Sequence, residues 1–164
     1  MIVAASLLAA LLVVLAVVYA FAPRQTGASS SRGAASTLSP TAARYLALAT
    51  AANRRLETAN DGYKKDELSN LAAARADLRS EVATETSFDE QLARIPFSLS
   101  IASIARALIL ANEQRGTLTA RQARSASLAQ LRSFDARHKA KDAAVEVQVR
   151  LLRKALQLPP PTTS

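Results

Sequence analysis

The amino-acid sequence predicts an all-α protein: a single N-terminal transmembrane helix, a flexible linker and an antiparallel bundle of about four helices. Apolar residues make up 49% of the 164-residue chain, yet only 4% of residues are aromatic and only four are glycine. Ala and Leu dominate the apolar content, and both lose little conformational freedom in a helix. After the linker, apolar residues recur every three or four positions, which indicates amphipathic helices. The predicted segments are an anchor (1–23), a linker (24–39), a helical bundle domain (40–158) and a Pro/Thr tail (159–164).

The anchor prediction depends on residues 2–22, which contain no charged side chain. At 1.5 Å per residue this run reaches about 31 Å, enough to cross a hydrocarbon core of about 30 Å. A cleaved signal peptide is the alternative. It is disfavoured because no Lys or Arg precedes the run, and because the run is longer than a typical signal core. We therefore expect an integral, single-pass protein of the cell membrane.

The orientation prediction depends on Arg24 and Arg32, the first basic residues after the apolar run. Positive charge is retained on the cytoplasmic side, so the bundle is predicted to be cytoplasmic and the N-terminus external. The linker is rich in Ser, Gly and Ala and is predicted to be a flexible coil. It would suit an extracytoplasmic spacer equally well, so that placement stays open.

The first two helices are predicted over 40–60 and 66–95. Ser39 is placed to cap the first, and Gly62 is placed to end it in the left-handed conformation. In the second, polar and β-branched residues gather before Ser87, where a break is expected. Pro96 ends the pattern.

The next two helices are predicted over 100–115 and 120–158. Gly116 is expected to close the first, and Thr119 with Gln122 forms a possible capping box for the second. Residues 145–149 alternate as a strand would, but strong helix formers flank them, so a helix is predicted. Pro159 and its two following prolines end it.

The apolar arc near the C-terminus is wider than that of an ordinary surface helix. Val145 and Val149 belong to one apolar stripe, while Val147 and Leu151 belong to a neighbouring one. Either this helix is central in its own bundle, which is slightly favoured, or the second stripe docks a protein partner or another copy of the chain. The candidate interaction surface comprises Val147, Leu151, Ala155, Arg150, Arg153 and Lys154.

The basic residues of the same predicted helix suggest a second surface. The chain has a formal net charge of +8, and a basic helix face can lie on anionic lipid headgroups. Nucleic acid is a less favoured partner because no recognised motif is present and no aromatic residues interleave the charges. The candidate lipid-facing residues are Arg121, Arg124, Arg132, Arg137, Lys139 and Lys141.

No residue pattern predicts a catalytic, cofactor or metal site. The chain has no cysteine, and no phosphate-binding loop or nucleophile elbow is present. Asp135, His138 and Asp142 share one helix face, and carboxylate–histidine pairs of this kind hold metals in some helical bundles. There is no second histidine, so a solvated polar patch is the preferred interpretation.

These observations predict a non-enzymatic, membrane-anchored scaffold or interaction protein that docks a protein partner through helix faces. The alternative is a peripheral module that binds anionic lipid with the basic face of 120–158. A metal-dependent enzyme built on His138 is a remote alternative.

Overall fold

The computed structural model describes residues 38–161, which fold into four long α-helices and one short one. They are α1 (Pro40–Asp66), α2 (Leu71–Ala93), α3 (Leu99–Gln122), α4 (Leu128–Arg132) and α5 (Asp135–Ala155). Within 38–161 there is no strand, which confirms the all-α prediction, and no helix there is long and apolar enough to span a bilayer. The predicted anchor, the linker up to residue 37 and the last three residues lie outside the described part.

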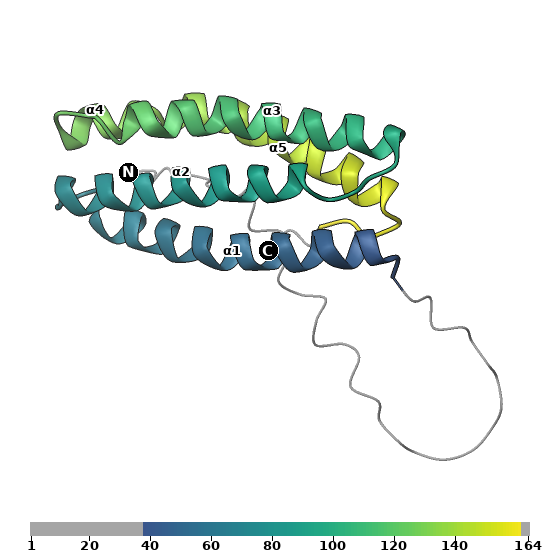
Figure 1. Ribbon diagram of the computed structural model, residues 1–164. Helices are drawn as coiled ribbons and strands as arrows, with labels where there is room; N and C mark the ends of the chain where they lie inside the picture. The colour runs from purple at the N-terminus through teal and green to yellow at the C-terminus, as the bar shows by residue number, and fades with distance from the viewer. Residues whose placement is uncertain (1–37, 162–164) are drawn as a thin grey trace, which may run out of the picture.

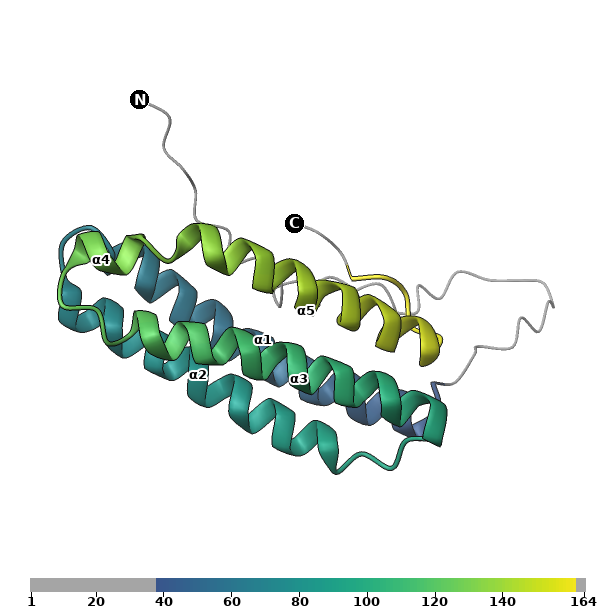
Figure 2. The same ribbon diagram turned by 90° about the horizontal axis from the view of Figure 1, so that it is seen from above.

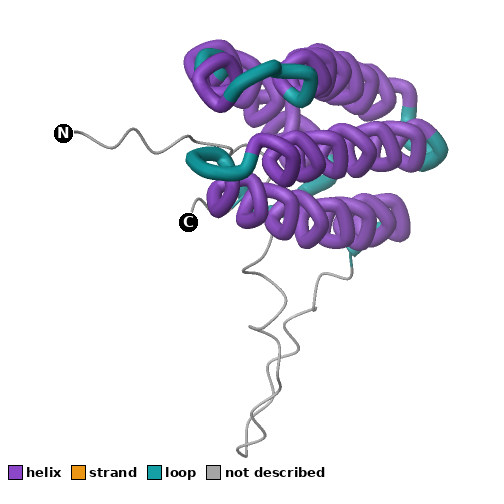
Figure 3. Tube along the Cα trace, turned by 90° about the vertical axis from the view of Figure 1, so that its left-hand side faces the viewer, coloured by secondary structure: helices purple, strands orange, loops and turns teal. Residues whose placement is uncertain are grey.

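The long helices form an antiparallel bundle in which each one packs against the next along the chain. Figure 1 shows α1 and α3 running in one direction and α2 and α5 in the other. In Figures 1 and 2, α4 lies at the end of the bundle opposite the start of α1, in the connection from α3 to α5. Figure 3 looks along the bundle and shows the helix axes nearly aligned.

Helix α1 begins as predicted but ends later. The Ser39 hydroxyl accepts a hydrogen bond from the Ala42 amide at 3.1 Å. The predicted end at Asn60 is wrong, because the helix continues through Gly62 to Asp66, and Gly62 does not adopt a positive φ. A Cβ on Gly62 would lie 2.7 Å from the Asp77 carboxylate. This glycine therefore leaves space for the Asp77 side chain of α2 and does not end the helix.

Helix α2 begins later than predicted and is uninterrupted. It starts at Leu71, where the Asn70 side chain caps it by accepting a hydrogen bond from the Ala73 amide at 3.1 Å. The expected break near Ser87 is wrong, because the helix runs through that residue to Ala93.

The boundary predicted between the last two helices is also wrong. Helix α3 continues through Gly116 to Gln122, and Thr119 is fully buried within it. The Thr119 hydroxyl donates to the Arg115 carbonyl at 3.2 Å, so it does not cap a new helix. The predicted helix 120–158 is divided into the end of α3, a turn, α4 and α5. The helical prediction for residues 145–149 is confirmed.

The described core consists of two apolar clusters with polar residues between them. The larger cluster takes Tyr45 from α1, Phe88 from α2, Leu108 from α3 and Leu152 from α5. The smaller cluster lies toward the α4 end and contains Tyr63, Ala74, Leu78, Ala123 and Leu131. Along α2, α3 and α5 most of the buried positions between these clusters are polar or charged, the exceptions on α3 being Gly116 and Leu118.

Candidate functional site

A polar layer occupies positions where a helical bundle usually places Leu or Val. On α2 the buried sequence Leu78, Glu81, Glu85, Phe88, Leu92 has the alternating three- and four-residue spacing of a bundle seam. Two of its five members are carboxylates. Helices α3 and α5 have the same spacing and contribute further buried polar residues to the layer: Asn112, Arg115, Thr119 and Gln122 from α3, and His138 and Asp142 from α5.

Arg115 lies at the centre of this layer and is 2% exposed. Its Nε donates to Asp142 Oδ1 at 2.7 Å, and Nη2 donates to Glu81 Oε1 at 2.5 Å. Its Nη1 donates to Glu85 Oε1. One guanidinium on α3 is thus bonded to two carboxylates of α2 and one of α5. It connects three helices through side chains that are about thirty residues apart in the sequence.

The network holds more negative than positive charge. Three carboxylates surround one guanidinium, so full ionisation would leave two negative charges uncompensated in a site shielded from water. Burial raises the pKa of Glu81 and of Asp142, although Arg115 opposes the rise in both. Burial alone would lower the pKa of Arg115, but Glu81 and Asp142 outweigh it and the net shift is upward. Arg115 therefore stays charged, and Glu81 and Asp142 favour protonation more than free carboxyl groups do.

His138 lies one helical turn before Asp142 and is 7% exposed. Neither ring nitrogen has a hydrogen-bond partner within residues 38–161. Burial, followed by the charges of Arg115 and Arg137, lowers the pKa of His138 to about 4, so the ring is neutral near pH 7. The expected solvated patch at His138 and Asp142 is therefore wrong, because both side chains are buried. In the described part no three His, Asp or Glu side chains are arranged to hold a metal ion.

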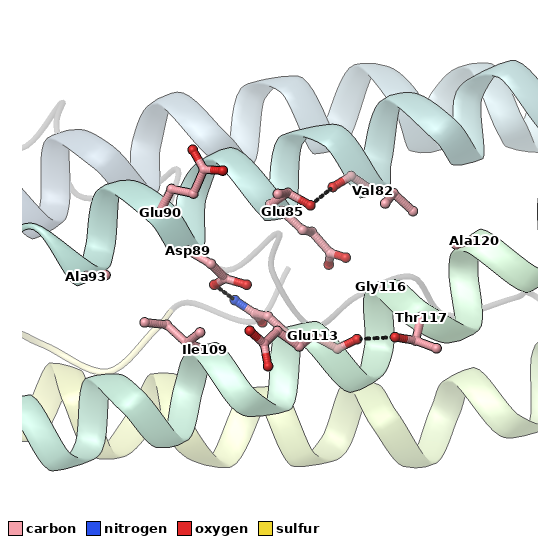
Figure 4. A pocket seen from close by; sticks show the side chains of 12 residues that line it. Val82, Glu85, Asp89, Glu90, Ala93, Ile109, Glu113, Gly116, Thr117 and Ala120 are labelled. Carbon is pink, nitrogen blue, oxygen red and sulfur yellow. Dashed lines mark hydrogen bonds between the residues drawn. The ribbon is translucent and has the colours of Figure 1, made fainter.

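A groove of about 730 Å³ opens between α2 and α3 beside the charge network. Figure 4 shows Glu85 and Asp89 projecting from α2 toward α3, with Glu113 on the opposite helix. Asp89 accepts a hydrogen bond from Asn112 Nδ2 at 2.8 Å, and burial raises the pKa of Asp89 to about 7. No Lys or Arg lines the groove, although the chain as a whole is basic. Its lining consists of Val82, Glu85, Thr86, Asp89, Glu90, Ala93, Ile109, Asn112, Glu113, Gly116, Thr117 and Ala120.

The predicted interaction surface is exposed in part. Val147 and Leu151 on α5 are 44% and 45% exposed, and Arg150 and Lys154 are also exposed. Arg150 donates to Glu146 at 2.8 Å on the same helix. Ala155 is half-buried.

Arg153 does not belong to that surface. It is 2% exposed, and its Nε donates to the Pro159 carbonyl at 2.7 Å, which ties the chain after α5 back to the helix. Burial lowers the pKa of Arg153. Its assignment to an exposed surface is wrong because the helix turns this position toward the core.

The predicted lipid-facing residues are solvent-accessible but do not lie on one helix. Lys141 is half-buried and donates to Gln114 on α3 at 2.9 Å, whereas the other five are exposed. Arg137 lies 4.2 Å from the centre of the Phe134 ring. The six residues are spread over the end of α3 (Arg121), the following turn (Arg124), α4 (Arg132) and α5 (Arg137, Lys139, Lys141).

Sequence reasoning missed Arg115, Glu81 and Glu85 as a connected set. The signal that could have found them is the pair of carboxylates at Glu81 and Glu85, inside the seam between Leu78 and Phe88. A charge at such a position is costly unless a partner reaches it from another helix. The search for partners would then have led to Arg115, which continues the α3 seam after Leu108 and Asn112.

No protein-family model matches the chain, and neither the curated proteins nor the solved structures contain a significant match to it. The functional interpretation therefore depends on the geometry of the bundle itself.

Proposed function

We propose that this chain is a non-enzymatic, membrane-anchored interaction protein whose helical bundle docks a second copy of itself through the outer stripe of α5. The outer stripe is Ala144, Val147, Leu151 and Ala155. The supporting observation is that Val147 and Leu151 are nearly half exposed, although the core side of α5 is already filled by Val145, Val149 and Leu152. Two apolar side chains one turn apart on an exposed face gain free energy when covered.

The order of side-chain sizes along the stripe favours a second copy as the partner. Small residues stand at its ends and larger ones at its centre. In an antiparallel pair of α5 helices related by a two-fold axis, each Val147 meets the other copy's Leu151, and each Ala144 meets Ala155. Such self-complementarity is the condition for a closed, two-fold interface.

The anchor supports the same proposal. The outer stripe alone is smaller than the roughly 800 Å² per partner that a stable complex in solution usually buries. Confinement to a membrane by residues 2–22 raises the effective concentration of copies, so that a small interface suffices. Arg24 and Arg32 favour a cytoplasmic bundle.

The lipid-binding alternative receives less support from the geometry. The basic residues lie where α3 ends and α5 begins, at the opposite end of the bundle from the start of α1 (Figures 1 and 2). They belong to the end of α3, the following turn, α4 and α5, so no single helix face presents them together to a bilayer. We therefore do not propose lipid as the partner.

The test is Leu151→Glu in the full-length chain, reconstituted in lipid bilayers and scored by single-molecule photobleaching. Wild type is expected to be dimeric and the variant monomeric, with unchanged helical circular dichroism. The matched control is Leu99→Glu, which introduces the same charge at an 89% exposed leucine of α3 and should stay dimeric. A monomeric wild type, or a Leu151→Glu variant that pairs as wild type does, would contradict the proposal.

A further inference from the structure

The groove between α2 and α3 contains an arrangement of charges that the proposed self-association does not use. It follows α2 from Val82 to Ala93, a rise of about 16 Å. Glu85 and Asp89 are one turn apart on this wall, and Glu113 stands on the facing helix (Figure 4). Apolar surface from Val82, Ile109 and Ala120 lies among these carboxylates.

Two buried side chains in this groove have acceptors without partners. Glu85 is 2% exposed, and its Oε2 has no hydrogen-bond partner within residues 38–161. Asn112 is 1% exposed, and its Oδ1 is likewise unpartnered there. Buried polar atoms are nearly always hydrogen-bonded, so we expect each of these oxygens to accept a hydrogen bond from a donor outside the described residues. Both residues line the groove, and each oxygen has less than 1 Å² of accessible surface, so a donor in the groove reaches it after a small rotation of the side chain.

We propose that this groove binds a linear aliphatic polyamine, with ammonium groups on the carboxylates and methylene segments against the apolar lining. Ammonium supplies only donors, and the orphaned atoms are only acceptors. The rise of about 6 Å between Glu85 and Asp89 is comparable to the separation of the two nitrogens in a short diamine. The groove's length accommodates three or four amines in an extended chain.

The shape of the groove favours a polyamine over the other cations that carboxylates attract. A metal ion needs several ligands converging on one point, and no such group of His, Asp or Glu occurs among the described residues. The carboxylates are instead distributed along the groove. A volume of about 730 Å³ lies within the range of small-molecule sites, about 300–1,000 Å³.

The experiment is a calorimetric titration of the full-length chain in detergent micelles with spermidine at pH 8 and low salt. At this pH Asp89 is ionised, since its pKa is about 7. The test variant is Asp89→Asn/Glu113→Gln, which removes one charge from each wall while preserving size. The matched control is Glu57→Gln/Asp61→Asn on α1, which removes the same two charges outside the groove lining.

We expect saturable binding of one spermidine, weakened about tenfold in the groove variant and less than about twofold in the control. Magnesium ion at the same concentration should neither bind in a saturable way nor displace spermidine. Absence of saturable binding would overturn the proposal, as would equal weakening in both variants. Displacement by magnesium would show a diffuse counterion effect. Capture of a Lys-rich peptide with no response to spermidine would assign the groove to a protein segment.

Discussion

Replacing Arg115 by Met should destabilise the bundle more than any other single loss of charge. Met fills a similar length but leaves Glu81, Glu85 and Asp142 without their shared cation. Removing one partner of a buried ion pair costs about 3–5 kcal/mol. Since a domain of this size is stable by about 5–15 kcal/mol, the variant should lie near the limit of folding at pH 7.

The loss should depend on pH in a defined direction. Without Arg115, burial raises the pKa of Glu81 and Asp142 with no cation to oppose it. A carboxyl group whose folded pKa exceeds its unfolded pKa contributes stability below the unfolded value, and this contribution is lost as pH rises through the folded value. The variant should therefore regain stability relative to wild type when the pH falls from 7 toward 5.

The assay is urea unfolding of the full-length chain, followed by circular dichroism at both pH values. The control is Arg150→Met, which removes a 52% exposed arginine from its pair with Glu146 and should cost about 0.5 kcal/mol or less. A second variant covers the case in which Arg115→Met does not fold: it combines Arg115→Met with the amide replacements of Glu81, Glu85 and Asp142, and should restore folding. The reasoning is refuted if Arg115→Met costs no more than Arg150→Met, or if its cost is the same at pH 5 and 7.

Two further predictions concern His138 and Gly62. The folded pKa of His138, about 4, is below its ordinary value of 6.5. The unfolded chain therefore takes up a proton first as the pH falls. The free energy of unfolding that neutral His138 contributes above pH 6.5 therefore falls by about 2–3 kcal/mol as the pH decreases to 4. His138→Leu should lack this loss in urea unfolding at pH 7 and 4, and equal pH dependence in both proteins would contradict the assignment. Gly62→Ala should stabilise the bundle by up to about 1 kcal/mol in thermal unfolding, because the half-buried Asp77 side chain can rotate away from the new methyl group. A loss above 1 kcal/mol would instead indicate a left-handed glycine or a fixed Asp77.

The helical class and the start of the bundle could be predicted because they depend on neighbours in sequence. Ser39 caps α1 through an amide three residues away, and the helical assignment of 145–149 follows from the flanking residues. The continuation of α1 through Gly62 and of α3 through Gly116 could not be predicted in this way. A glycine that ends a helix and one that admits a neighbouring carboxylate look the same in sequence. Only the positions of Asp77 and Glu85 on α2 distinguish them.

The charge network was hidden from sequence analysis for a related reason, and this reason suggests what the network does. Hydrophobic periodicity identifies a buried seam by its apolar residues. Arg115 is stable in such a seam only because α2 and α5 place carboxylates at the same level. The guanidinium of Arg115 can bond all three carboxylates at only one relative position of the helices. Sliding α2 or α5 by one turn would bury unpaired charge at a cost of several kcal/mol. We therefore expect the polar layer to contribute to the helix register, as a single buried polar residue does in coiled coils.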